Sequence, residues 1–227
     1  MQRRPFLLLS TAPVATWSLL AHAPVLAADE RTTVAGIKEA LAVGTENAVK
    51  SLGREDGYFG HAAVKILLPP SAQKLADVAR KAGFSRQVDE LVLGMNRAAE
   101  KAAPLAASFF ADAIRGMGIR DVQAIMKAGD TGATAFFERT TRSNLFGAFR
   151  PSVAQSIERV GASRAYKNLM ERAQRVPMLG VQNFDLDEHV TNKALDGLFF
   201  VVGEEEKKIR RNPLARTTSV LKAVFGR

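Results

Sequence analysis

The chain of 227 residues contains no cysteine and a single tryptophan, Trp17. Without cysteine, the fold cannot be held by disulfide bonds, by a zinc site with cysteine ligands or by lipid attached to a cysteine. Histidine occurs only at positions 22, 61 and 189, so no paired-histidine metal motif exists. A G-x-S-x-G nucleophile turn and a Gly-Lys-Ser/Thr phosphate loop are missing as well. The sequence therefore predicts neither a bound metal nor a cofactor.

Acidic residues are absent from the first 28 positions, which have a basic start followed by an apolar stretch. Arg3 and Arg4 precede the apolar residues 6–26, and this order is typical of a secretory signal peptide. We predict that residues 1–27 are a removable signal, cut after Ala27, and that the protein is periplasmic or secreted. The paired arginines leave both the general secretory route and the twin-arginine route open.

Positive charge exceeds negative charge, with 32 Lys and Arg against 23 Asp and Glu and a formal net charge of +9. A basic surface attracts anionic lipid, lipopolysaccharide or nucleic acid, although charge spread over a solvated surface explains the same balance. The basic residues are spread along the chain and are not interleaved with aromatic residues, which argues against a nucleic-acid groove. The partner is left open between an envelope protein and anionic lipid. No transmembrane span is expected once the signal has been removed.

Apolar residues recur at helical spacing between glycines and prolines, which predicts an all-α fold. No linker rich in Pro, Gly or Ser divides the chain, so we expect a single irregular domain over residues 28–227. The strand-like run 64–68 is expected to be a short extended segment packed on helices. Pro151 suits the first turn of a helix and predicts a helix start there. About nine or ten helices are expected, near residues 32–53, 75–83, 91–102, 109–114, 122–126, 131–146, from 151, 162–175, from 185 and 213–225.

Five short blocks occur in a fixed order along the chain. They are Gly36–Leu41, Val64–Pro69, Met95–Glu100, Gly129–Thr134 and Val190–Phe199. Together the blocks resemble the exported bacterial family known as domain of unknown function DUF4197, and the likeness covers residues 31–226. The resemblance implies an exported helical protein of Gram-negative bacteria. It implies no activity, cofactor or catalytic residue.

Two helical stretches carry polar residues among apolar ones, and buried polar groups need partners. The candidate polar network consists of Asn96, Arg97, Glu100, His189, Asn192, Lys193 and Asp196. One interpretation is a polar pocket between two central helices, in which Glu100 and Asp196 bind a cation or act as acid and base. The other is a structural network of ion pairs that fixes how the two helices pack.

Two further segments have a functional and a structural interpretation. Tyr58, Phe59 and His61 lie in a glycine-rich loop, where they could contact a ligand or membrane. Alternatively, Tyr58 and Phe59 fold back as an apolar lid. The backbone N–H groups of Gly129–Thr134 could hold an anion at a helix start, although helix capping explains the same residues. Residues 204–210 are expected to be a solvated helix end with the ion pairs Glu204–Lys208 and Glu206–Arg210.

The sequence thus favours a non-enzymatic envelope protein that binds a ligand, lipid or partner protein through a groove between helices. The alternative is an enzyme, hydrolase-like or of another type, that uses Glu100 and Asp196 for acid–base chemistry.

Overall fold

The computed structural model describes residues 23–159 and 185–211, together with positions 161, 164, 166–168 and 171. Within these residues the regular structure is helical and no strand is present, which confirms the predicted all-α fold. The helices are α1 (Ala23–Gly53), α2 (Pro70–Ala79), α3 (Ser85–Ala102), α4 (Ala106–Gly116), α5 (Ile119–Lys127), α6 (Gly132–Arg159) and α8 (Leu186–Arg211). Between α2 and α3 the chain kinks at Arg80–Phe84, where Gly83 has a left-handed φ of 88°. Short 3-10 turns at Ala103–Leu105 and Gly129–Thr131 precede α4 and α6.

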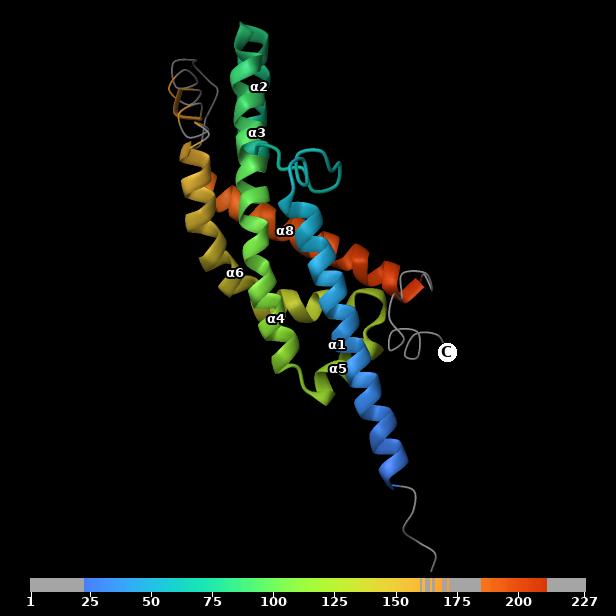
Figure 1. The fold of residues 1–227 in the computed structure, drawn as a ribbon. Helices are drawn as coiled ribbons and strands as arrows, with labels where there is room; N and C mark the ends of the chain where they lie inside the picture. Colours follow the sequence, from blue (N-terminus) through green and yellow to red (C-terminus); the bar gives the residue numbers. More distant parts are fainter. Residues whose placement is uncertain are drawn as a thin grey trace, which may run out of the picture.

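α8 lies at the centre of the arrangement and crosses behind α1 and α3 in the view of Figure 1. It packs against α6, α1 and α3, while α6 also packs on α3 and α4. Val190, Ala194, Leu195 and Leu198 of α8 are fully buried. A cluster of buried apolar side chains therefore reaches from α1 to α8, as expected for a single domain.

α6 is one helix of 28 residues with Pro151 inside it, so the prediction that a separate helix starts at Pro151 was wrong. Proline removes a backbone hydrogen bond and normally breaks a helix. Here fully buried Leu145, Phe149, Val153 and Ile157 continue the same i,i+4 row across the proline. Tertiary packing of that row outweighs the local preference of proline. Such merging gives the described residues fewer helices than the nine or ten expected.

Two other predicted helices fall largely or wholly outside the described residues. Only single positions of 162–175 are described, and 213–225 lies beyond the described part. α8 begins at Leu186, next to the start expected at residue 185. The backbone N–H of Glu188 donates to Asp185 Oδ1 at 2.9 Å. A side-chain oxygen that satisfies a free N–H of the first turn is what places a helix start.

Between α1 and α2 the chain forms a loop and then residues 65–69, which are neither helix nor strand. Val64, Ile66 and Leu68 are buried, whereas Lys65 is half-buried and Leu67 is 52% exposed. This alternation is that of an extended chain with one face on the core. It agrees with the extended segment expected at 64–68, and no second strand pairs with it among the described residues.

Candidate functional site

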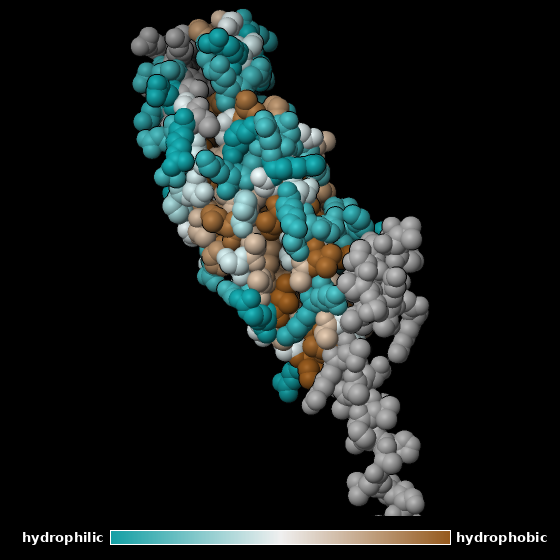
Figure 2. Space-filling model, viewed as in Figure 1, coloured by the Kyte–Doolittle hydropathy of each residue, from teal (hydrophilic) through white to brown (hydrophobic). Residues whose placement is uncertain are grey.

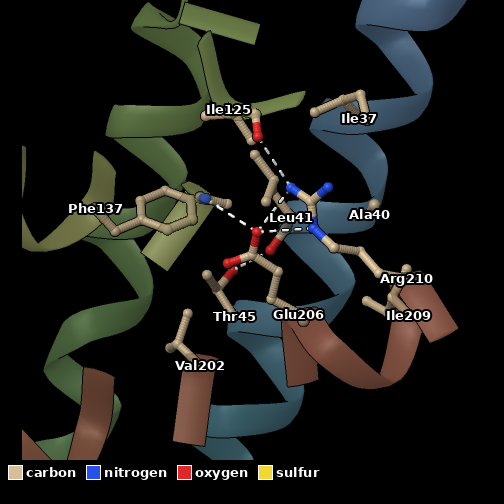
Figure 3. A pocket seen from close by; sticks show the side chains of 12 residues that line it. Ile37, Ala40, Leu41, Thr45, Ile125, Phe137, Val202, Glu206, Ile209 and Arg210 are labelled. Atoms are coloured by element: carbon tan, nitrogen blue, oxygen red, sulfur yellow. Dashed lines mark hydrogen bonds and ion pairs between the residues drawn. The ribbon is translucent and has the colours of Figure 1, made fainter. Parts of the chain in front are cut away.

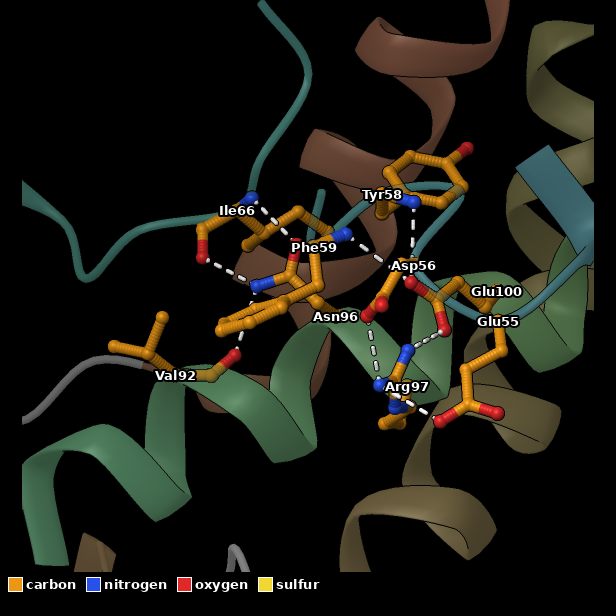
Figure 4. A network of polar contacts seen from close by, with 9 residues as sticks. All are labelled: Glu55, Asp56, Tyr58, Phe59, Ile66, Val92, Asn96, Arg97 and Glu100. Carbon is orange, nitrogen blue, oxygen red and sulfur yellow. Dashed lines mark hydrogen bonds and ion pairs between the residues drawn. The ribbon is translucent and has the colours of Figure 1, made fainter. Parts of the chain in front are cut away.

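Glu100, on α3, is a buried carboxylate that binds the loop following α1 (Figure 4). Its Oε1 accepts the backbone N–H groups of Tyr58 and Phe59, each at 3.1 Å. Its Oε2 accepts Arg97 Nη1 at 2.6 Å. Both oxygens therefore have partners, and the charge of the carboxylate is balanced by a neighbouring guanidinium.

Arg97 extends this network to the outside of the loop. Its Nη2 reaches Asp56 Oδ1 at 2.8 Å and Glu55 Oε1 at 3.2 Å. The hydrogen bond to Glu100 keeps the pKa of Arg97 above its usual value. The guanidinium thus binds Glu100 on its own helix and two carboxylates on the loop, which fixes the loop against α3.

Asn96 lies one turn before Glu100 on α3 and is fully buried. Its Oδ1 accepts the backbone N–H of Ile66 at 2.8 Å, and its Nδ2 donates to the carbonyl of Ile66 at 2.8 Å and to that of Val92 at 2.8 Å. The amide thereby takes the place that a neighbouring strand would have beside residue 66 (Figure 4).

The three candidate loop residues face different ways. Tyr58 is fully buried, its hydroxyl donates to the carbonyl of Ala194 on α8 at 2.7 Å, and burial together with the charge of Glu100 raises its pKa well above its usual range. Phe59 is half-buried and carries Lys65 Nζ 3.8 Å from its ring centre. His61 packs edge-on against Phe200, with ring centres 6.4 Å apart.

The polar residues of α8 form a second, more exposed set. Asp196 accepts Arg142 Nη2, from α6, at 2.7 Å and Lys193 Nζ at 3.1 Å. Burial alone would raise the pKa of Asp196, but these two cations outweigh it and hold the pKa below its usual value. Asp196 is therefore a charged, paired surface carboxylate.

His189 connects α8 to the extended segment. Its Nε2 donates to the carbonyl of Leu67 at 2.8 Å, with the tautomer inferred from this acceptor. Partial burial lowers the pKa of His189, and the hydrogen bond to Leu67 offsets only part of that effect. Asn192, one turn on, is half-buried.

The candidate polar residues thus fall into two sets and not into one pocket. Asn96, Arg97 and Glu100 bind the loop and the extended segment from α3, whereas His189, Lys193 and Asp196 lie on α8. In the described part of the chain, Glu100 and Asp196 share no partner.

A cleft of about 410 Å³ lies between residues 63–70 and one face of α8. Leu67 and Phe200, which are 52% and 45% exposed, contribute apolar surface to it. Lys65 and Lys193 contribute positive charge, and the one acid, Asp196, is paired with Lys193 and with Arg142. The remaining lining is mostly apolar or backbone, from Ala63, Val64, Leu68, Pro69, Pro70 and Gly197, with His189 beside it.

A second groove, of about 420 Å³, runs between α1 and α4. Small and apolar side chains dominate its lining, among them Ala42, Val49, Ala107 and Ile114. Figure 2 shows apolar residues gathered over the middle of this face of the molecule. The groove contains one acid, Glu46, and this residue pairs with Lys50.

Glu206 is a buried ion-pair residue whose importance the sequence reasoning missed (Figure 3). It accepts the backbone N–H groups of Ala133 and Thr134 at 3.0 and 2.9 Å and the Thr134 hydroxyl at 2.8 Å. Arg210 donates to it at 2.8 and 3.0 Å and also binds the carbonyl of Ile125.

The suspected anion site at Gly129–Thr134 therefore overlaps a helix start that binds an anion belonging to the protein itself. The carboxylate of Glu206 takes the free N–H groups in the first turn of α6. Beside it lies a partly open pocket with only about 20 Å³ of space, room for one water-sized molecule. Glu206–Arg210 pairs as predicted, but it is buried, and Glu204 pairs with Lys207 where Lys208 was expected.

The family model described as "Protein of unknown function (DUF4197)" matches residues 27–226. The chain belongs to the DUF4197 family. This match confirms the resemblance carried by the five sequence blocks and extends it by a few residues at the N-terminal side. No curated protein and no solved structure matches the chain. The site of this DUF4197 protein therefore has to be interpreted from its own geometry.

A Ser-x-x-Lys spacing, Ser71 to Lys74 on α2, also occurs in this DUF4197 chain. In acyl-transferring hydrolases such a lysine acts with the partner motifs Ser-Asp-Asn and Lys-Thr-Gly, which are absent from the sequence. Lys74 is exposed, while the side chain of Ser71 lies outside the described residues. The spacing alone carries no activity.

The described residues contain no group of three or more His, Asp or Glu side chains placed to hold a metal ion. Among the same residues, no helix has the length and apolar character needed to cross a membrane. Among the described residues of this DUF4197 protein, the cleft beside α8 combines open volume, exposed apolar surface and two lysines against one acid.

Proposed function

We propose that the protein is a non-enzymatic binding protein whose ligand or partner occupies the cleft between residues 63–70 and α8. This proposal rests on one observation: the exposed apolar residues Leu67 and Phe200 line the same open cleft as Lys65 and Lys193. Binding sites combine apolar surface with a few placed polar groups, and exposed apolar side chains mark surfaces that a partner covers. The cleft has both properties.

The state of the carboxylates supports binding over acid–base catalysis. A general acid or base needs access to its substrate and a pKa near the working pH. Glu100 is buried with both oxygens occupied, and Asp196 has a pKa below its usual value and two cationic partners. Neither carboxylate is therefore available to transfer a proton, and Glu100 and Asp196 do not face a common position where a substrate could bind both.

The place of action that we propose is the bacterial periplasm. The support is the pattern of residues 1–27, with basic, apolar and small-residue regions in the order of a signal peptide. A binding protein of positive net charge in that compartment meets envelope proteins and anionic lipid, the two partner classes expected from the composition.

The cleft is tested with the dye 8-anilinonaphthalene-1-sulfonate, which carries one negative charge on an apolar ring system. We expect Phe200→Ser and Lys193→Ala each to raise the dissociation constant of the dye about fivefold, because each removes one contact worth roughly 1 kcal/mol. Leu105→Ser and Lys101→Ala are matched controls, since both residues are exposed and lie outside the cleft. Equal affinities for all four variants would contradict the proposal.

A further inference from the structure

We propose that the occupant of this cleft is an extended polypeptide segment bearing a carboxylate, hydrogen-bonded to the backbone of residues 65–67. The inference rests on the proposed function, since it takes the same cleft as the binding site and names the chemistry of the partner. Three observations carry it: the direction of the backbone groups, those groups that have no partner, and the charge of the cleft.

The direction of the backbone groups follows from two hydrogen-bond partners. Both the N–H and the C=O of Ile66 bind Asn96, so the peptide groups of residue 66 point toward α3. In an extended chain the hydrogen-bonding groups of successive residues point to opposite sides. Those of residues 65 and 67 therefore point away from α3, and the bond from His189 to the carbonyl of Leu67 shows that this side faces α8.

Two backbone groups on the α8 side have no hydrogen-bond partner among the described residues. They are the C=O of Lys65 and the N–H of Leu67, and both residues line the cleft. The N–H of Lys65 is used by the carbonyl of His61 at 3.0 Å, and the C=O of Leu67 by His189. One acceptor and one donor, two residues apart, thus remain open.

An acceptor and a donor at this spacing match one residue of a neighbouring parallel chain. In a parallel pair, a residue beside position 66 donates its N–H to the C=O of residue 65 and accepts the N–H of residue 67 with its own C=O. Binding of an extended peptide to an open strand edge uses such main-chain bonds for affinity. An amphiphile such as a fatty acid has no N–H for the Lys65 carbonyl, so a peptide satisfies both groups and a fatty acid does not.

The side chains around the cleft define which peptide fits. Lys65 and Lys193 line the cleft together with one acid, Asp196, so the lining carries one excess positive charge. Asp196 pairs with Lys193 and Arg142, and Arg142 also pairs with Glu138, which leaves Lys65 as the cation of the cleft with no acidic partner in the described structure. A carboxylate on the peptide, either an Asp or Glu side chain or a free C-terminus, complements this charge. Leu67 and Phe200 offer apolar contacts to alternate side chains of the same peptide.

The test compares two substitutions at one position. Leu67→Ala removes the leucine side chain beyond Cβ and keeps the backbone N–H. Leu67→Pro removes the leucine side chain and the backbone N–H as well. That N–H makes no internal hydrogen bond in the described structure. Octapeptides are selected on the wild-type chain from two random libraries, one with free C-termini and one with both ends embedded in a carrier. We expect selected sequences to carry a carboxylate, and the library in which they appear tells a terminal carboxylate from a side-chain one.

A selected peptide is then measured on each variant, with thermal unfolding as the check of the fold. We expect Leu67→Pro to bind about fivefold more weakly than Leu67→Ala, the effect of one hydrogen bond. The wild-type chain supplies an independent measurement, in which methylation of the paired peptide N–H lowers affinity by a similar factor. Equal affinity of the two variants, together with no effect of methylation, would overturn the peptide proposal.

The anionic dye separates this failure from that of the proposed function. If dodecanoate and the dye bind at the cleft and no octapeptide is selected, the cleft is a binding site for amphiphiles and the peptide inference is wrong. If neither dye, dodecanoate nor peptide depends on Phe200 and Lys193, the proposed function itself is wrong.

Discussion

Tyr58 joins α3 to α8 by one backbone and one side-chain hydrogen bond. Its backbone N–H binds Glu100 on α3, and its hydroxyl binds the carbonyl of Ala194 on α8. The ring passes so close to α8 that a Cβ added at Gly197 would lie 2.8 Å from Tyr58 Cε1 and 3.0 Å from Val64 Cβ. A glycine is therefore required where the loop crosses the helix.

We expect Gly197→Ala to lower the free energy of unfolding by about 1–3 kcal/mol, because the added methyl group displaces a fully buried ring. Gly147→Ala is the control, since nothing lies within 4 Å of a Cβ built at that helical glycine. The control should be neutral or more stable by up to about 1 kcal/mol, through better helix propensity. Chemical denaturation measures both; a Gly197→Ala protein as stable as the control would refute the close contact.

His189 makes stability depend on pH in a defined direction. Burial lowers its pKa in the folded protein, so the unfolded chain binds the proton at a higher pH than the folded chain does. Stability from this residue is therefore complete above the usual histidine pKa of about 6.5 and decreases as the pH falls below it. Asp196, whose pKa is also lowered, loses its contribution only in the more acidic range below the usual aspartate pKa.

His189→Gln retains a side-chain N–H for the Leu67 carbonyl but does not titrate. The difference in unfolding free energy between the wild-type and this variant should shrink or reverse as the pH falls from 7.5 to 5. Urea denaturation at several pH values measures it. A difference independent of pH would show that the burial of His189 does not bias its protonation.

At the scale of the elements, Glu206 holds the end of α8 on the start of α6. Its carboxylate binds the N–H groups of Ala133 and Thr134 and pairs with Arg210, and its side chain is 6% exposed. Removing one partner of a buried ion pair leaves the other uncompensated. Through this ion pair the C-terminal part of α8 contacts the start of α6, and Arg210 also binds the carbonyl of Ile125 on α5.

We expect Glu206→Gln to lower the free energy of unfolding by about 2–4 kcal/mol, because Arg210 and one helix N–H lose a charged acceptor. Glu204→Gln, two residues before it, breaks an exposed pair with Lys207 and should cost less than about 1 kcal/mol. Thermal or urea unfolding of both variants gives the comparison. Equal effects would mean that the pair at Glu206 is no stronger than a surface pair.

The predictability of the elements from the sequence depended on how local their causes are. Helical periodicity is local, and it identified α8 and the all-α class. Pro151 misled because the row Phe149, Val153 and Ile157 keeps α6 together through contacts distant in sequence. Spacing also made Glu206 look like a surface residue, since its partners Ala133 and Thr134 lie more than 70 positions away.

The same distinction applies to the candidate site. The polarity of Asn96 and Glu100 amid apolar residues marked them out, but their partners are backbone groups of the 58–66 region, which no residue type reveals. The cleft escaped prediction because Leu67 and Phe200 are exposed through the path of the chain, and their residue types gave no sign of it.

At the scale of the whole molecule, export decides whether the full-length chain or the processed chain meets a partner. The predicted cut after Ala27 lies within α1, ahead of Ile37, the first buried apolar residue among the side chains of α1 that the structure describes. Processing would lower the formal net charge from +9 to +7, because Arg3 and Arg4 leave, and would remove the only tryptophan, Trp17. The basic character of the protein would therefore persist after processing.

We expect the protein produced in a Gram-negative host to appear in the periplasm with the mass of residues 28–227 and with tyrosine emission alone. Replacing both Arg3 and Arg4 by lysine then distinguishes the routes. The twin-arginine route requires the arginine pair, so loss of periplasmic protein identifies it, whereas the general secretory route tolerates lysine because it needs only positive charge. A cytoplasmic chain of full mass with an indole emission band would show that residues 1–27 are not a cleaved signal, and the partner would then have to be sought among cytoplasmic polypeptides.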